Sequence, residues 1–263
     1  MLIQRMNSFK PTADAACNIC LVAGKKLTRD HVPPSGALGG RKAVHVRQPL
    51  KEQLADRDPR QPIQIVSKTG VCFTTVCEDC HQKISSFDDS LKQFVQNAKT
   101  GLLYRSTVLD SVSVEAKSDA VIRSILAHNL TSRFQSSQSV FERQIRSIVK
   151  NNDLTEGKTL FLYVWQYSGT DIFMMHDFVV PHNSLRMPIG SVLSFPPLTF
   201  FLACQELDGI KGMNVEDHLR SPRGRISVNL HSDPSGMWPR SAGAIMGGAA
   251  MAEFVQANEM ASN

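Results

Sequence analysis

The sequence predicts an α+β fold in two parts, and three observations support this. The chain has 263 residues, enough for one large domain or two modest ones. Two CxxC pairs in the first third indicate a module organised by a metal. Beyond residue 106, helical periodicity gives way to runs of β-prone residues. We therefore expect an N-terminal module over residues 1–105 and a C-terminal mixed α/β region of unassigned fold over residues 106–263.

The composition is that of a globular protein. Apolar residues make up 42% and charged residues 20% of the chain, which gives no indication of disorder. No run of about 18 apolar residues predicts a transmembrane helix. The first residues lack an apolar segment of signal-peptide length. These features predict a cytoplasmic protein without a membrane partner.

The positive charge is concentrated in the N-terminal part. The chain has a net charge of +5, and residues 1–110 carry 16 Lys and Arg against 10 Asp and Glu. The remaining residues carry 13 against 14. A basic surface on the N-terminal part would suit a polyanion such as nucleic acid.

The N-terminal elements follow from local chemistry. Residues 1–16 look like a flexible lead-in, and residues 17–20 form a tight knuckle turn. A short strand over residues 25–31 should end at Pro33 and Pro34, because proline removes a ladder donor and restricts its predecessor.

Residues 35–69 are rich in Gly, Pro and charge, and we interpret them as a long insertion. Three of its basic residues, Arg41, Lys42 and Arg47, are candidates for phosphate contact. A solvated loop is the alternative interpretation.

Further along, residues 66–76 should include a strand, with apolar and β-branched residues. An amphipathic helix should begin at about His81 and end near Gly101, because glycine suits a C-terminal cap. Its apolar residues recur at three- and four-residue steps: Ile84, Phe87, Leu91, Phe94 and Val95.

The C-terminal region should contain helices followed by strands. Ser118 and Asp119 could cap a helix that runs to about Phe134, and a shorter helix covers residues 141–149. Residues 198–207 fit either a helix or a buried strand. Four strands are expected at residues 159–167, 172–180, 192–195 and 226–230, and a small terminal helix at residues 247–256.

The four paired cysteines predict a structural zinc site. Each CxxC pair presents two thiolates from one tight turn, and four thiolates form a tetrahedral site without an open position. The ligands would be Cys17, Cys20, Cys77 and Cys80. The other two cysteines, Cys72 and Cys204, are interpreted as small buried apolar residues.

The pattern CxxC…Asp-His-Val-Pro…CxxCHxxK resembles the HNH endonucleases, whose fold is the ββα-metal motif. The resemblance covers roughly residues 15–100. The matching residues are the four paired cysteines together with Asp30, His31, Pro33, His81 and Lys83.

The resemblance implies a division of roles at a DNA-cleaving site. His31 would act as general base on water, while Asp30 and His81 would bind magnesium or manganese at the scissile phosphate. The chemistry is sensible, because attack on a phosphodiester needs a polarising cation and an activated water. An imidazole is suited to that proton transfer at neutral pH. Lys83 would contact phosphate or be a solvated lysine.

The sequence departs from the family pattern at one position. Cys72 stands where an asparagine is expected, and a thiol cannot make the amide's two hydrogen bonds. Thr74 or Thr75 could substitute. Successive strand residues also point to opposite faces, so Asp30 and His31 can share a site only if the strand ends there.

Two functions from different classes follow. The first is a metal-dependent HNH endonuclease acting on DNA, with RNA not excluded, in a bacterial or phage defence or mobile-element context. One such site cuts one strand, so double-strand cleavage would need a homodimer. The C-terminal region would bind target, effector or a regulatory partner. The alternative is a catalytically degenerate, zinc-organised module that binds nucleic acid.

Other polar clusters are interpreted as structural or solvated. Asp88 follows His81 by seven residues and lies on the same helical face. We interpret Asp88 and Asp89 as part of a solvated surface. The alternative is that Asp88 supports the metal ligands from behind. The acid–histidine pairs at residues 176–177 and 217–218 show no spacing that ties them to a mechanism.

Overall fold

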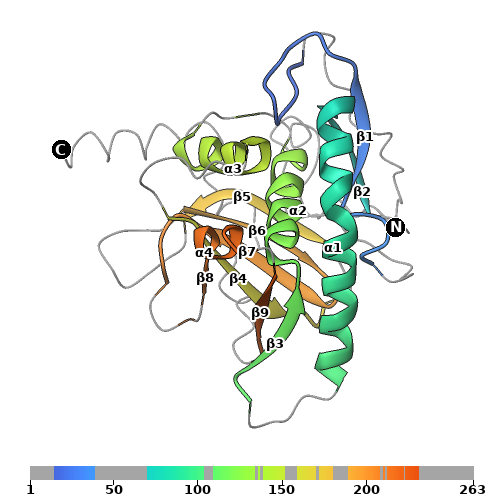
Figure 1. Ribbon diagram of the computed structural model, residues 1–263. Coiled ribbons are helices and arrows are strands. Elements are labelled where there is room, and N and C mark those ends of the chain that lie inside the picture. Colours follow the sequence, from blue (N-terminus) through green and yellow to red (C-terminus); the bar gives the residue numbers. More distant parts are fainter. Residues whose placement is uncertain are drawn as a thin grey trace, which may run out of the picture.

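A computed structural model describes residues 15–38, 70–103, 109–133, 136, 139–151, 159–169, 172–179, 189–207, 210, 212–221 and 223–230. They form a two-stranded sheet, a seven-stranded sheet and four helices (Figure 1). The α+β class predicted from the sequence is confirmed. The expected terminal helix and most of the predicted insertion, with Arg41, Lys42 and Arg47, lie outside the described residues.

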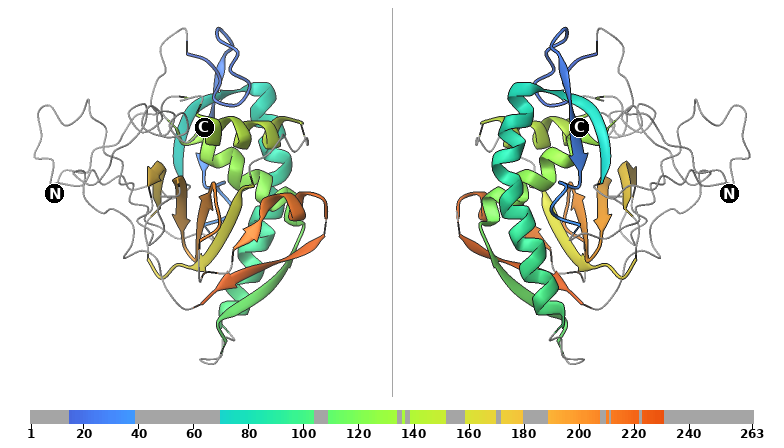
Figure 2. Two further views of the ribbon diagram at one scale, coloured as in Figure 1. Left: turned by 90° about the vertical axis from the view of Figure 1, so that its left-hand side faces the viewer. Right: turned by 90° about the vertical axis from the view of Figure 1, so that its right-hand side faces the viewer.

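The N-terminal module is a β-hairpin followed at once by a long helix. Strands β1 (Leu27–Val32) and β2 (Val71–Cys77) pair antiparallel, and α1 (Glu78–Leu103) begins at the next residue. The register shifts between Thr28 and Asp30, which marks a bulge in the pair. The hairpin lies beside α1 and α2 and pairs with no strand of the larger sheet (Figure 2).

Helix α1 has the amphipathic pattern that the sequence predicted. Glu78 and Asp79 lie in its first turn, where carboxylates interact favourably with the helix dipole. Its buried apolar side chains recur on one face: Ile84, Leu91, Phe94, Val95, Ala98 and Leu102. That face packs on α2 and on β3 of the larger sheet, and most of the residues between these apolar positions are exposed or partly exposed.

The larger sheet has the order β3-β9-β4-β7-β6-β5, with β8 also paired to β4. Its strands are β3 (Ser111–Ala116), β4 (Phe161–Gln166), β5 (Phe173–Val179), β6 (Ile189–Phe195), β7 (Leu198–Ala203), β8 (Met213–Asn214) and β9 (Gly224–Asn229). The ambiguous segment from residue 198 is therefore a strand, and all six residues of β7 are buried. The polar strand β3 and the two-residue β8 were not predicted.

Helix α2 (Ser118–Thr131) is the central helix, because it packs against α1, α3, the hairpin and the larger sheet. The prediction that Ser118 caps it was wrong. The cap position is Lys117, and the Ser118 hydroxyl donates instead to the carbonyl of Ser221 at 3.0 Å. The remaining helices are α3 (Val140–Asn151) and α4 (Val215–Leu219).

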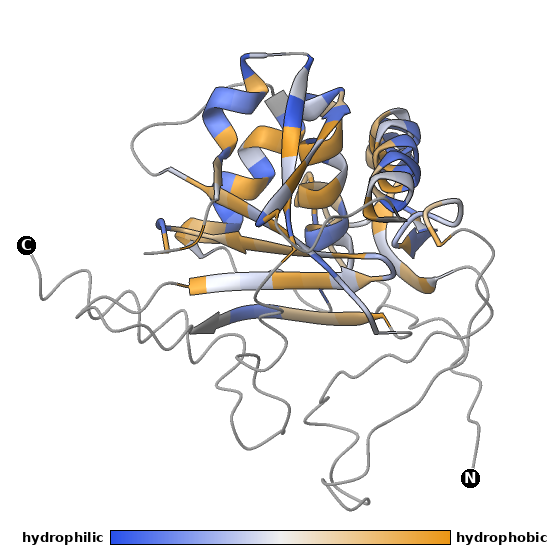
Figure 3. Ribbon diagram, turned by 90° about the horizontal axis from the view of Figure 1, so that it is seen from below, coloured by the Kyte–Doolittle hydropathy of each residue, from blue (hydrophilic) through white to orange (hydrophobic). Residues whose placement is uncertain are grey.

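Helices cover one face of the larger sheet, as the view from below shows (Figure 3). One hydrophobic core joins α1 and the hairpin to α2, α3 and this sheet face. A second cluster around Tyr163, Trp165 and Phe201 lies on the other sheet face. The predicted boundary near residue 105 stays a prediction, although side chains from both sides of it share the core. No helix in the described ranges is long and apolar enough to cross a membrane.

Candidate metal centre

The four paired cysteines come together in one cluster, called here the thiol cluster: Cys17, Cys20, Cys77 and Cys80. The Sγ atoms of all four lie within 4.8 Å of one another, and those of Cys20 and Cys77 are 3.8 Å apart. Zinc held at about 2.3 Å by four thiolates requires sulfur separations of about 3.8 Å. The four cysteines are thus close enough to hold a metal such as zinc, as their spacing predicted.

The electrostatics of the thiol cluster also favour a cation. The Cys80 thiol donates to Cys17, which lowers the pKa of Cys17 to about 4, and the same bond raises the pKa of Cys80. The amide of Cys77 also donates to the Cys17 sulfur, at 3.3 Å. Without a metal the thiols must share protons, because four thiolates at this spacing would repel one another.

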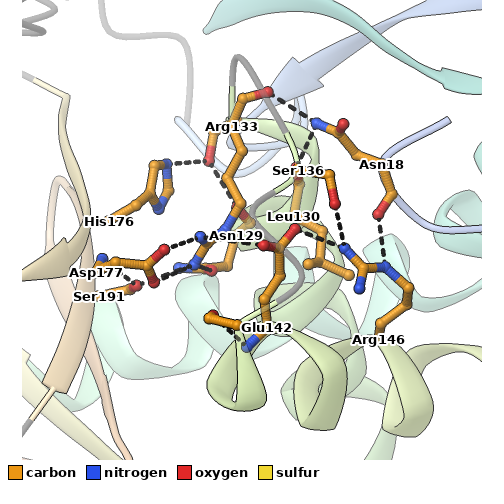
Figure 4. Close-up of polar contacts among 12 residues, drawn as sticks. Asn18, Asn129, Leu130, Arg133, Ser136, Glu142, Arg146, His176, Asp177 and Ser191 are labelled. Carbon is orange, nitrogen blue, oxygen red and sulfur yellow. Dashed lines mark hydrogen bonds and ion pairs between the residues drawn. The ribbon is translucent and has the colours of Figure 1, made fainter. Parts of the chain in front are cut away.

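The loop that carries Cys17 and Cys20 is fixed to the C-terminal region by Asn18. The buried Asn18 amide donates to the carbonyls of Leu130 and Arg133, at 3.0 and 2.8 Å. The backbone carbonyl of Asn18 accepts a hydrogen bond from Nε of Arg146 on α3, at 3.0 Å. Figure 4 shows Asn18 between the end of α2 and Arg146. The thiol cluster therefore shares its support with the helices that follow it.

A second cluster lies on the inner face of the hairpin, and we call it the carboxylate–histidine cluster: Asp30, His81, Asp88 and His128. The carboxylate of Asp30 on β1 is buried, and its Oδ1 lies 3.6 Å from Nε2 of His81. His81 stands in the first turn of α1, directly after Cys80, and its side chain is 30% exposed. The two residues expected to share a cation therefore lie next to each other.

Two members of this cluster were not assigned to it from the sequence. His128 of α2 is fully buried, and its Nε2 donates to Oδ1 of Asp88 at 2.9 Å. Its Nδ1 lies 3.9 Å from Oδ2 of Asp30. The hydroxyl of Ser124 also donates to Asp88, at 2.8 Å. Asp88 is buried, so the prediction that it belongs to a solvated surface was wrong for it.

Charges within the carboxylate–histidine cluster favour a positive group. Burial opposes protonation of His128, but its bond to Asp88 and the nearby carboxylates outweigh that effect and raise its pKa. Burial alone would raise the pKa of Asp88, but the interactions with His128 and Ser124 together have the larger effect, and the pKa is lowered overall. Two carboxylates in one buried place need a compensating positive charge.

His31 does not share the inner face with Asp30. Pairing continues through Val32, so β1 does not end at Asp30 and His31 as a shared site would require. The pleat directs His31 to the other, partly exposed face, opposite Cys72. Cys72 accepts a hydrogen bond from Nε of Arg29, at 3.2 Å. Oδ1 of Asp30 accepts from the His31 amide at 2.9 Å, which links the two faces through the backbone.

The described part of the chain includes one candidate for phosphate contact, Lys83, and an open cleft. Lys83 is exposed, and its ammonium donates to the carbonyl of Lys150 at the end of α3. The cleft of about 420 Å³ lies between α1 and the loop after Pro34, and Lys92 and Lys99 line it. The ammonium of Lys92 pairs with Asp89 at 3.0 Å.

The acid–histidine pair at residues 176–177 is part of a buried structural network (Figure 4). Asp177 forms a two-pronged ion pair with Arg133, and the second contact is 2.8 Å long. Asp177 has φ of +50°, in the bulge of β5, a conformation that aspartate tolerates. His176 bonds to the hydroxyl of Ser132 through Nε2, at 3.0 Å. Burial and the Arg133 charge lower the pKa of His176 to about 3, so this histidine is neutral.

Comparisons with known proteins add no family to this geometry. No family model matches the chain, and neither the curated proteins nor the solved structures contain a match. The resemblance to HNH endonucleases therefore rests on the sequence motif alone.

Proposed function

We propose that this protein is a metal-dependent endonuclease that hydrolyses phosphodiester bonds of DNA at Asp30 and His81. The observation that carries the proposal is the approach of these two side chains, at 3.6 Å, beside a cluster of four cysteines. They come from different elements and are 51 positions apart in the numbering, so local sequence alone does not bring them together. Their motif is the one that resembles the HNH endonucleases.

The donor set fits a divalent cation. Asp30 is buried, and among the described residues its Oδ2 has no hydrogen-bond partner, which leaves that oxygen available for a ligand. His81 is partly exposed and lies on the solvent side of the site. A magnesium or manganese ion held there would polarise the phosphodiester and offset the charge that develops on its oxygens.

The protein's own residues would then perform three tasks. Asp30 and His81 would bind and position the cation, and α1 and β1 would hold them rigidly. An imidazole nitrogen of His31 would take the proton from the attacking water. His31 lies on the other, partly exposed face of β1, so its role is the part of the proposal that the His31→Ala variant tests most directly.

A DNA substrate is favoured by charge. The positive excess of the chain lies in residues 1–110, and two lysines line the cleft beside the loop that follows Pro34. Exposed lysines that contact phosphates bind any sequence and weaken with salt. The excess of basic residues supports a polyanionic substrate, and DNA is the polyanion that the resemblance to HNH endonucleases implies.

Incubation with supercoiled plasmid tests the proposal. With manganese or magnesium, the wild-type protein should convert the plasmid to nicked circles. Asp30→Asn, His81→Ala and His31→Ala should each lower the rate by about 100-fold or more. His176→Gln, at a partly buried histidine outside the cluster, should leave it unchanged. Plasmid bound but left intact with every divalent metal would refute the proposal, and cleavage of RNA alone would change the substrate class.

The alternative, a nucleic-acid-binding module without catalysis, is favoured by one specific observation. His31 and Cys72 face each other on the side of β1 opposite Asp30, and Cys72 already bonds to Arg29. In this alternative the thiol cluster orders the hairpin, and the basic residues bind nucleic acid. Equal nicking by the wild type and His31→Ala would remove His31 from catalysis without supporting this alternative.

A further inference from the structure

We infer that His128 is a third protein ligand of the cation at Asp30 and His81, and that it makes the site prefer manganese to magnesium. The inference rests on the proposed function, since it concerns the same cation. His128 lies in α2, outside the residues that resemble the HNH endonucleases. Nothing in the motif assigns it a role.

Two buried polar atoms without hydrogen-bond partners lie opposite each other between β1 and α2. Oδ2 of Asp30 and Nδ1 of His128 are buried, and neither has a hydrogen-bond partner in the described part of the chain. They lie 3.9 Å apart and belong to β1 and α2. Buried polar atoms of folded proteins are nearly always satisfied, so two that lie opposite each other indicate a missing shared partner.

The ring of His128 is held by its hydrogen bond to Asp88. Its Nε2 lies 2.9 Å from a carboxylate oxygen of Asp88, so this nitrogen carries the proton and donates it. The pKa of His128 is raised, so binding of a cation would release the proton from Nδ1, and the lone pair of that nitrogen would then lie towards Asp30. Metal-binding histidines commonly donate their other N–H to a carboxylate in this way, which fixes the ring and raises its basicity. Asp88 would be the residue that positions His128.

The distance between Nδ1 of His128 and Oδ2 of Asp30 is too long for a direct hydrogen bond. A hydrogen bond between Nδ1 and Oδ2 would measure about 2.7–3.2 Å, which is shorter than the 3.9 Å observed. Ligands about 2.1 Å from one octahedral cation lie about 3.0 Å apart when adjacent and about 4.2 Å apart when opposite. The contacts of Asp30 with His128 and with His81, at 3.9 and 3.6 Å and through different carboxylate oxygens, lie between these two values, so shifts of about 0.3 and 0.6 Å would bring them to octahedral separations.

One adjustment completes the site. The two imidazoles approach different oxygens of Asp30, and the three residues do not form a group whose donor atoms all lie within 4.8 Å. His128 is fully buried and fixed by Asp88, whereas His81 is 30% exposed. A rotation of the His81 side chain would therefore close the site. Three protein ligands leave positions for water and for a phosphate oxygen.

The ligand types predict the preference between metals. Magnesium favours oxygen ligands and water, whereas imidazole nitrogen favours the transition metals. Two imidazoles and one carboxylate should therefore bind manganese at least about 10-fold more tightly than magnesium. With His81 as the sole imidazole ligand, this preference would be weaker.

Manganese binding to the zinc-loaded protein tests the inference without reference to cleavage. Pulsed electron paramagnetic resonance of bound manganese should detect two coordinated histidine nitrogens in the wild type. His128→Gln keeps a donor for Asp88 but should remove one nitrogen signal and weaken manganese binding by about 100-fold. Asp88→Asn should weaken it by about 10–100-fold. His176→Gln, the same change at a partly buried histidine outside the cluster, should alter neither measurement.

The outcomes separate the inference from the proposed function. If the wild type shows one nitrogen signal, and only His81→Ala removes it, His128 is not a ligand while the proposed function stands. If manganese does not bind at all, both fail. The wild-type spectrum needs no substitution, so a poorly folded His128→Gln cannot decide the outcome.

Discussion

The thiol cluster and the carboxylate–histidine cluster differ in how completely the chain can surround a cation. The thiol cluster brings four identical donors within 4.8 Å, and two of them, Cys17 and Cys77, are buried. The carboxylate–histidine cluster combines two buried carboxylates with two imidazoles, one of which is partly exposed. Four thiolates leave no place for a substrate, whereas the second cluster leaves several.

Under the proposed function, this difference gives the thiol cluster a structural role and the carboxylate–histidine cluster a catalytic one. Metal at the thiol cluster would hold the knuckle loop, the end of β2 and the start of α1 together, and Asn18 would extend that support to α2 and α3. The carboxylate–histidine cluster depends on this support, because His81 follows Cys80 directly. Loss of the first cluster should therefore disable both, whereas loss of the second should spare the fold.

The largest expected effect is that of Cys77→Ser. Structural zinc supplies about 10–16 kcal/mol of apparent binding free energy in small zinc domains, so its loss should unfold the hairpin. Zinc content and thermal unfolding would measure this, with chelation of the wild type giving the same result. Cys72→Ser, which changes a cysteine outside the cluster, should keep the metal. Full zinc content and stability in Cys77→Ser would show that the cluster is not structural.

The next effect concerns His176, a partly buried histidine beside the Arg133 guanidinium, whose effect on its pKa is larger than the opposing effect of the Asp177 carboxylate. Its pKa is about 3 in the folded state and about 6.5 when unfolded, so only the unfolded state binds this proton between those pH values. The contribution of His176 to the free energy of unfolding is therefore complete above pH 6.5. It is lost as the pH falls towards 3, by about 5 kcal/mol in total.

Denaturant unfolding of the wild type and His176→Gln across this range measures that contribution. The variant should lose stability less steeply on acidification than the wild type. Identical slopes would mean that His176 is not held neutral, and would remove the contrast with His128, whose pKa is raised.

A smaller effect is expected at Asn18, which connects the loop that carries Cys17 and Cys20 to α2. Asn18→Ala removes both donors from the carbonyls of Leu130 and Arg133, at a cost of about 1–3 kcal/mol for each buried group left unpaired. Chemical unfolding of the zinc-loaded protein would measure it. Asn97→Ala on the exposed face of α1 is the control, and should change stability by about 0.5 kcal/mol or less. An equal effect of both changes would contradict the coupling.

The smallest stability effect is that of Asp30→Asn in zinc-loaded protein free of other divalent metals. Asparagine keeps the oxygen that accepts from the His31 amide and removes one of the two buried carboxylate charges that face His128. We expect a change within about 1 kcal/mol, or a gain, because residues that serve function are often unfavourable for stability. A loss of several kcal/mol in thermal or denaturant unfolding would show that Asp30 has a structural role instead.

The sequence predicted those parts of the molecule that depend on local spacing. The CxxC pairs identify the thiol cluster because each pair needs only one tight turn. The periodicity of α1 and the β-prone runs identify most elements of the core. Strand β3 has no such signal, because two serines and a glutamate are among its six residues. This segment becomes a strand through its pairing with β9.

The carboxylate–histidine cluster could be predicted only in part, because it depends on which faces meet in the fold. His128 lies in an apolar helical segment, and no spacing indicates that this segment packs under β1. Asp88 gave a signal: it lies two helical turns after His81, on the same face. Its neighbour Asp89 is exposed and pairs with Lys92, so the same dipeptide contains one buried and one surface carboxylate.

The most direct test of the contrast between the clusters is anomalous diffraction from crystals of zinc-loaded protein soaked in manganese. Two separate peaks are predicted. One, at the zinc edge, should lie among the four Sγ atoms. The other, from manganese, should lie between Asp30, His81 and His128, with water in its remaining positions. A zinc peak alone, with manganese absent from Asp30 at saturating concentration, would contradict the account.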